Sequence, residues 1–281
     1  MKYHCWIRPL AFLGVAVLTL GQGQAQFARQ VHDYQAGSGA ANGYTNPAAA
    51  LGEPSRITPG PFGGPVDPFN TAYLDSQLVS IGAGGSLTVK FATPLLNDPA
   101  HSYGLDFLIF GGAGFIITNA FDSEFNYIGT PATDGGMFGA QTGQTRVSVS
   151  ADGTQFFTLN PALAPAVEAL FPTDGQGNFS QPVNPALGTT AFAGLTLEGI
   201  RALYSASGGG AGFDLAWAED AQGLPVELPA VNFVRIDVLS GKIEVDAFSQ
   251  VSAVPEPAGW ALLALGSVIL AWRRNVIATN P

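Results

Sequence analysis

Cysteine is almost absent from the chain: the single Cys among 281 residues is Cys5, close to the start. For the rest of the chain this excludes a disulfide framework, a thiolate metal site and a cysteine nucleophile. Charged residues are also few, at 11% of the sequence. The folded protein must therefore rely on a hydrophobic core, to which a bound cation could add stability.

Basic residues are scarce in the middle of the chain. Between residues 26 and 252, seven Lys and Arg stand against 20 Asp and Glu, a net charge of −13. Proteins that bind nucleic acids place clustered Lys and Arg against the phosphates, so we expect no nucleic-acid partner. The same negative charge repels anionic polymers unless a divalent cation bridges the two.

Sequence motifs of catalysis are missing as well. Neither a GxSxG elbow nor an HExxH zinc helix occurs, and GGAGF at 111–115 and 209–213 does not complete a phosphate-binding GxGxxG. Only His32 and His101 lie beyond residue 25. We expect a protein that is not an enzyme. A carboxylate pair assembled from distant residues, as glycoside hydrolysis needs, is the alternative.

The N-terminus has the polarity of a secretory signal peptide. Lys2 and Arg8 precede an apolar run at residues 9–20, and the small residues Gly23 and Ala25 follow. The run is shorter than the roughly 20 apolar residues that cross a membrane. We therefore predict a signal peptide at residues 1–25, cleaved after Ala25, and export through the inner membrane.

The C-terminus combines three elements in a fixed order. Val254, Pro255, Glu256 and Pro257 are followed by the apolar residues 258–272 and then by Arg273 and Arg274. As a helix, the apolar stretch would reach about 22 Å, against a hydrocarbon core of about 30 Å. The arginine pair would stay on the cytoplasmic side. This order predicts a sorting signal at residues 253–281, whose apolar helix at 258–272 anchors the chain in the membrane before processing.

The run VPEPAGWALLALGSVILAWRRN resembles the PEP-CTERM sorting signal of Gram-negative bacteria that make extracellular polysaccharide. The resemblance implies that exosortase is the processing partner, that cleavage falls near residues 255–257, and that the product reaches the cell surface or the extracellular matrix. Residues 275–281 are longer and less basic than is usual after the arginines. A plain C-terminal anchor is the alternative, although an anchor has no need of Pro-Glu-Pro.

The remaining residues, 26–252, predict one extracellular domain with a loop-rich start at 26–80. Alternating apolar residues predict a strand at 86–91, and a nearly continuous apolar run predicts a buried central strand at 105–110. Two hairpins are expected, one at 146–150 and 155–159 and one at 232–239 and 243–247. Helices are expected at 161–171 and Leu197–Tyr204. We predict an all-β fold, an antiparallel jelly-roll-like sandwich with short helical insertions.

The pattern from Ser86 through Asp106, together with VSVSADGTQFFTL and VNFVRIDVLSGKIEVDAF, resembles the galactose-binding-like domains of other PEP-CTERM surface proteins. Such domains often carry a structural cation. By this resemblance Asp106, Asp214 and Asp246, all beside predicted strands, are the first candidates for ligands of a structural Ca²⁺. The alternative is that they are solvated or cap turns.

Sugar binding would need aromatic faces or polar groups that converge on an exposed loop surface. Trp217 and Tyr204 are the proposed ligand contacts, with Tyr73 and Tyr127 as further candidates, and packing in the core is the alternative. We expect a non-enzymatic surface or matrix protein that associates with exopolysaccharide. The rivals are a structural or adhesive protein that binds no sugar and, third, a polysaccharide hydrolase.

Overall fold

A computed structural model describes residues 27–139, 143–168 and 170–253. The predicted signal peptide with Ala25, the residues 254–257, the apolar stretch 258–272 and the arginines at 273 and 274 lie outside the described residues. Within the described ranges, no helix is long and apolar enough to cross a membrane.

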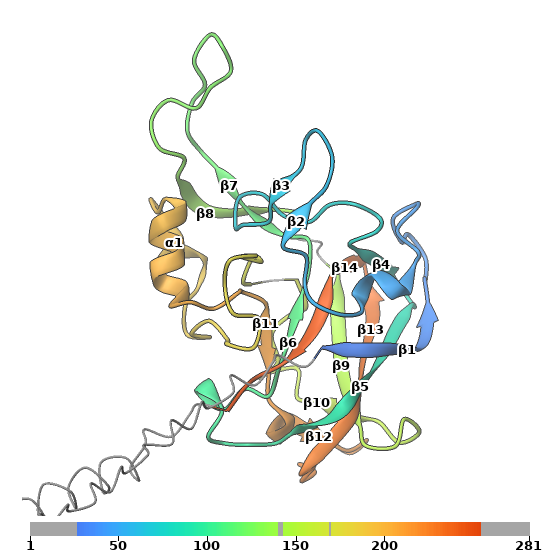
Figure 1. Cartoon of the computed structure of the whole chain (residues 1–281). Helices are drawn as coiled ribbons and strands as arrows, with labels where there is room; N and C mark the ends of the chain where they lie inside the picture. Colours follow the sequence, from blue (N-terminus) through green and yellow to red (C-terminus); the bar gives the residue numbers. More distant parts are fainter. Residues whose placement is uncertain (1–26, 140–142, 169, 254–281) are drawn as a thin grey trace, which may run out of the picture.

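The larger layer of the fold is a six-stranded antiparallel sheet with the order β1-β5-β13-β9-β10-β12 (Figure 1). Along β13 the apolar side chains of Val234, Ile236 and Val238 point into the core, and the residues between them face outward. The strands are β1 (Ala28–Gln35), β5 (Ser86–Leu96), β9 (Gln144–Ser150), β10 (Phe157–Leu159), β12 (Ala218–Glu219) and β13 (Ala230–Ser240).

Smaller sheets form the rest of the structure. A three-stranded sheet has the order β11-β6-β15, and three two-stranded pairs join β4 to β14, β2 to β3 and β7 to β8. Their bounds are β2 (Ile57–Thr58), β3 (Gly64–Pro65), β4 (Val79–Gly82), β6 (Phe107–Phe110), β7 (Gly114–Ile117), β8 (Thr133–Phe138), β11 (Ala211–Phe213), β14 (Lys242–Val245) and β15 (Ala247–Gln250).

One hydrophobic core joins the large sheet to the smaller ones. Val89 and Ile236 of the six-stranded sheet belong to the same buried cluster as Phe107, Phe213 and Phe248 of the three-stranded sheet. Phe107 and Phe213 stack with their ring centroids 5.2 Å apart. The structure is thus mostly β, which confirms the all-β class. The jelly-roll-like connectivity stays a prediction.

Three sequence predictions for strands are confirmed, and the strand at 86–91 is the first part of β5. β6 is buried along its whole length and lies between β11 and β15, as expected of a central strand with Asp106 at its beginning. β9 and β10 form the predicted hairpin. In its turn Asp152 accepts hydrogen bonds from the backbone N–H groups of Thr154 and Gln155, and these bonds hold the pKa of the Asp152 carboxyl well below its usual range.

The predicted closing hairpin is wrong in its pairing. The chain does turn between β13 and β14, and Gly241 there has φ +70°. However, β13 pairs with β5 and β9, whereas β14 pairs with β4. Both strands alternate buried and outward positions. This alternation determines which side chains face the core, but it does not determine which strand lies alongside.

The helix Leu197–Tyr204 is confirmed as α1, the α-helix of the described residues (Figure 1). Thr196 caps its start by accepting a hydrogen bond from Gly199 N–H. The predicted helix at 161–171 is wrong, because its described residues form turns and bends. Asn160 does accept a bond from Ala162 N–H, as a cap would. Pro165 lacks the N–H that a helix needs there.

The segment 26–80, predicted to be loop, contains a long edge strand. β1 pairs antiparallel with β5 along Ala28–Gln35, with two register irregularities. Most of its side chains are exposed or half-buried, as an edge strand allows, and so its sequence has little of the apolar signal by which strands are recognised.

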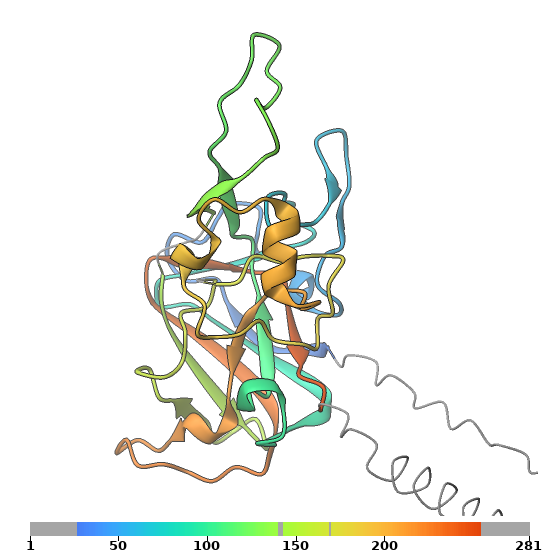
Figure 2. The same cartoon turned by 90° about the vertical axis from the view of Figure 1, so that its left-hand side faces the viewer.

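Two loops stand out on the same side of the molecule (Figures 1 and 2). One joins β7 to β8 and the other joins β2 to β3. The end of the described chain lies on the other side: β15 stops at Gln250, and Ala253 forms a β-bridge with His101. The domain therefore points these loops away from the place where the chain continues toward its C-terminus.

Candidate functional site

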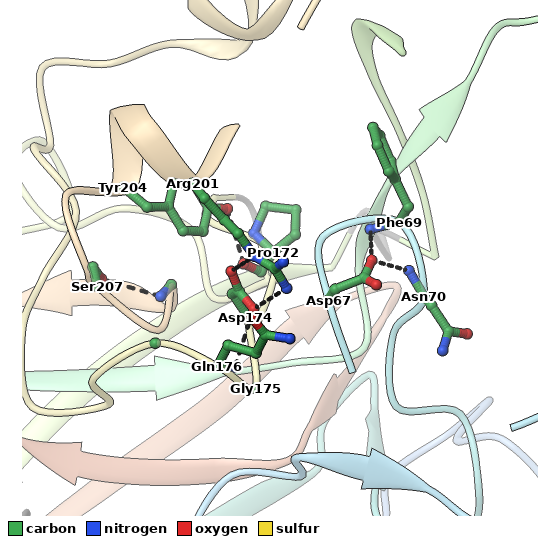
Figure 3. A network of polar contacts seen from close by, with 12 residues as sticks. Asp67, Phe69, Asn70, Pro172, Asp174, Gly175, Gln176, Arg201, Tyr204 and Ser207 are labelled. Carbon is green, nitrogen blue, oxygen red and sulfur yellow. Dashed lines mark hydrogen bonds and ion pairs between the residues drawn. The ribbon is translucent and has the colours of Figure 1, made fainter. Parts of the chain in front are cut away.

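Tyr204 is a core residue. Its side chain is 1% exposed and packs in a cluster with Phe192 and Phe171. Its hydroxyl donates to Pro172 O at 2.8 Å (Figure 3). The prediction that Tyr204 contacts a ligand is therefore wrong, because its ring faces other protein side chains and its hydroxyl holds α1 to the segment at residue 172.

Beside Tyr204, Arg201 of α1 forms an ion pair with the buried Asp174 (Figure 3). Its Nε donates to Oδ2 at 2.7 Å and its Nη2 to Oδ1 at 3.0 Å. Asp67 lies close enough for its charge to interact with both groups, and burial raises the pKa of Asp67. This network stabilises the fold, and its charged groups interact with one another.

Trp217 is half-buried and packs against two hydrophobic clusters, one around Val89 and one around Phe110. Its backbone carbonyl accepts a hydrogen bond from Asn160 N–H at 2.8 Å. The structure therefore places Trp217 at a seam between two parts of the core, which favours the packing alternative over the proposed ligand contact.

Asp106 and Asp214 lie side by side at the start of β6. Asp106 is fully buried, and its carboxylate accepts from Asp98 N–H at 3.1 Å and Leu215 N–H at 2.8 Å. His101 Nδ1 lies 2.8 Å from Asp106 Oδ1. Burial, with the neighbouring Asp106 charge, raises the pKa of Asp214. The Asp106 carboxylate therefore joins the start of β6 to the backbone at residues 98 and 215.

Asp246 does not join that pair. It precedes β15, whose first residue Ala247 pairs with Phe110, so it lies at the opposite end of β6 from Asp106. The intervening strand spans more than about 13 Å. Ser55 donates to Asp246 through its N–H at 2.8 Å and its hydroxyl at 3.0 Å. The three predicted calcium ligands therefore form no common site, and the described ranges hold no group of three His, Cys, Asp or Glu that could bind a metal.

An ordered loop between β7 and β8, residues 118–132, gathers exposed aromatic side chains, and we call it the aromatic loop. Backbone bonds close it at two levels, from Thr118 N–H to Ala132 O at 2.9 Å and from Ile128 N–H to Ala120 O at 2.8 Å. At its tip the Asp122 carboxylate accepts bonds from the N–H groups of Asn126 and Glu124, which lower the pKa of Asp122. These bonds give the tip a defined shape.

The aromatic loop presents its rings to solvent. The rings of Phe121 and Tyr127 are in contact, with centroids 4.5 Å apart and planes tilted by 31°. Phe125 is 86% exposed and has φ +62°, a backbone conformation that is unfavourable for a residue other than glycine. Phe62, on the loop between β2 and β3 at the same side of the molecule, is 87% exposed. Neither phenylalanine is explained by packing, so both are candidates for contact with a partner.

Tyr127 was among the aromatic candidates from the sequence, whereas Phe121 and Phe125 were missed. The signal that could have found them is local: FDSEFNY spaces three aromatic residues among charged and amide residues that form turns.

The comparisons with known proteins concern the C-terminus. The PEP-CTERM protein-sorting motif matches residues 253–275. No curated protein matches the chain. The match covers the sequence run that carried the predicted resemblance, so the chain carries a PEP-CTERM sorting motif, which implies processing by exosortase and sorting to the cell surface.

Proposed function

We propose that this exosortase-sorted surface protein carries a non-enzymatic domain that associates with exopolysaccharide through the aromatic loop. The observation that supports this proposal is the exposed aromatic pair of Phe121 and Tyr127, in ring contact on the same loop as the exposed Phe125. Flat aromatic faces pack against the C–H groups of sugar rings, and they lose little conformational entropy when they do.

The orientation of the domain also favours contact with the matrix. The C-terminal end of the described chain, from which the sorting motif continues, lies on the side away from the aromatic loop (Figures 1 and 2). A chain tethered or sorted through its C-terminus would therefore display the loop outward, toward the polymer that surrounds the cell.

The polar groups of the fold support a binding role more than a catalytic one. Asp106 and Asp174 are buried and bound by backbone N–H groups or by Arg201. A hydrolase needs its two carboxyl groups on either side of a bound glycosidic bond, whereas these two serve contacts within the fold.

The test is affinity electrophoresis of the full-length protein in mild detergent through gels that contain a panel of exopolysaccharides. We expect retardation by at least one polymer, and Phe125→Ser should weaken it about fivefold because stacking on one ring contributes roughly 1 kcal/mol. Leu224→Ser removes a side chain that is 61% exposed on another loop and serves as the control. Unretarded migration on every polymer would favour the adhesive, sugar-free alternative.

A further inference from the structure

A shallow groove of about 230 Å³ lies on the outward face of the six-stranded sheet. Three neighbouring strands and the turn before β10 contribute its lining, which consists of Arg146, Ser148, Phe156, Thr158, Arg235 and Asp237. Arg146 and Ser148 are on β9 and Arg235 and Asp237 on β13, and Arg235 pairs with Ser148 across the strands. The site is therefore built on regular strands, which hold side chains more firmly than loops do.

The groove brings two arginines together in a domain that is strongly negative. Asp237 lies between the two arginines: Arg235 Nε and Nη2 donate to its Oδ1 at 2.9 and 2.7 Å, and Arg146 Nη2 lies 3.5 Å from its Oδ2. The lining residues hold two guanidinium groups and one carboxylate, and the charge of Asp33 on β1 also acts on Arg235, so the two signs are close to balanced here, whereas residues 26–252 together carry −13. Charges farther away than about 8 Å are largely screened at physiological salt, so the N–H donors of the two guanidinium groups can still attract an anion.

The lining combines three kinds of contact that a charged sugar uses. A guanidinium has five N–H donors in a planar fork that matches a carboxylate, and Arg235 uses two of them on Asp237. The hydroxyls of Ser148 and Thr158 lie 3.4 Å apart at the floor. The ring of Phe156, 5.9 Å from the Arg235 guanidinium carbon, forms an apolar side.

We propose that this groove binds a single carboxylate-bearing sugar unit, with the arginines of β9 and β13 on the carboxylate and Phe156 on the ring. The size agrees with one ring, since pockets for larger ligands usually occupy about 300–1,000 Å³. The inference rests on the proposed association with polysaccharide and names an acidic sugar as a unit of the polymer. The groove and the aromatic loop are separate sites made by different strands.

The probe is sodium galacturonate, titrated into the full-length protein in mild detergent by calorimetry, with its methyl ester and inorganic sulfate as comparison ligands. We expect galacturonate to bind at least tenfold more tightly than either, because the ester has lost the charge and sulfate has no ring to place on Phe156. Equal binding of the ester or of sulfate would overturn the assignment.

Arg235→Gln and Arg146→Gln should each weaken galacturonate binding about tenfold, the worth of one charge-assisted hydrogen bond. Lys242→Gln, which removes a cation outside the groove, should leave it unchanged. Arg146 is about half exposed, and its loss leaves Asp237 paired with Arg235, so this variant keeps the fold if Arg235→Gln does not. Wild-type affinity in both arginine variants would contradict the proposal.

Phe125→Ser separates the two sites. It should leave galacturonate binding intact while it reduces retardation by polymers. If galacturonate binds but no polymer retards the protein, the groove stands and the role of the aromatic loop fails. If a polymer retards the protein but galacturonate does not bind, the proposed sugar site in the groove is wrong and the role of the aromatic loop stands.

Discussion

Replacing Arg201 by Met should destabilise the protein by about 3 kcal/mol, because it leaves a buried carboxylate without its cation. Asp174 is only 3% exposed in its side chain, and both of its oxygens accept from Arg201. Asp67 adds a second carboxylate to the same region; burial raises its pKa, and the charge of Arg201 opposes that rise. For a domain of this size the midpoint of thermal unfolding should fall by about 6–12 °C.

Two further variants identify the cause of that loss. Adding Asp174→Asn to Arg201→Met removes the stranded charge, and this double variant should recover a large part of the stability. Lys242→Met, which removes a partner 3.9 Å from Glu244 at the surface, should cost less than about 1 kcal/mol. If Arg201→Met melts like Lys242→Met, the pair does not stabilise the fold as we describe.

Replacing Asp246 by Asn should stabilise the protein strongly at pH 8 and clearly less at pH 5. Burial raises the pKa of Asp246 to about 7 from its ordinary value of 3.8. Between these values the folded state holds a proton that the unfolded state has released, so stability falls as the pH rises through this window. The gap corresponds to roughly 4 kcal/mol at about 1.4 kcal/mol for each unit of pKa.

Asn fits the site because its oxygen can accept from Ser55 N–H while its NH₂ group donates to the Ser55 hydroxyl. Urea unfolding at pH 5 and pH 8 measures the effect. Wild type should lose stability between the two, and Asp246→Asn should lose much less. Asp75→Asn removes an exposed carboxylate and should follow wild type. An unchanged pH dependence in Asp246→Asn would show that this carboxyl is not the group responsible.

The parts of the fold that the sequence predicts are those with local causes. α1 is specified by its cap at Thr196, and the β9–β10 hairpin by Asp152 and Gly153 in its turn. Pairings between distant residues have no such signal: Arg201 meets Asp174 across 27 positions, and Asp246 meets Ser55 across 191. The pairing of β14 with β4, and not with β13, also depends on distant residues. The sequence could not predict it, because the alternation of buried and outward residues is the same in either pairing.

The candidate sites divide in the same way. Arg146 and Arg235 lie on the wet faces of strands that the sequence does predict, but only the adjacency of β9 and β13 brings them together. The predicted calcium site failed for a similar reason. A position beside a strand does not show which end of the sheet the residue occupies, and Asp246 lies at the other end of β6 from Asp106 and Asp214. The sorting motif is read directly from the sequence, since it is one continuous run.

The central claim, that the Pro-Glu-Pro motif brings this domain to the cell surface, is tested by fractionating cells that express wild type or Glu256→Ala, with Glu227→Ala as the matched control. Both proteins with an intact motif should appear at the surface in a form shortened at the C-terminus. Glu256→Ala should remain in the inner membrane at full length. Equal surface display and equal shortening of Glu256→Ala would contradict the account.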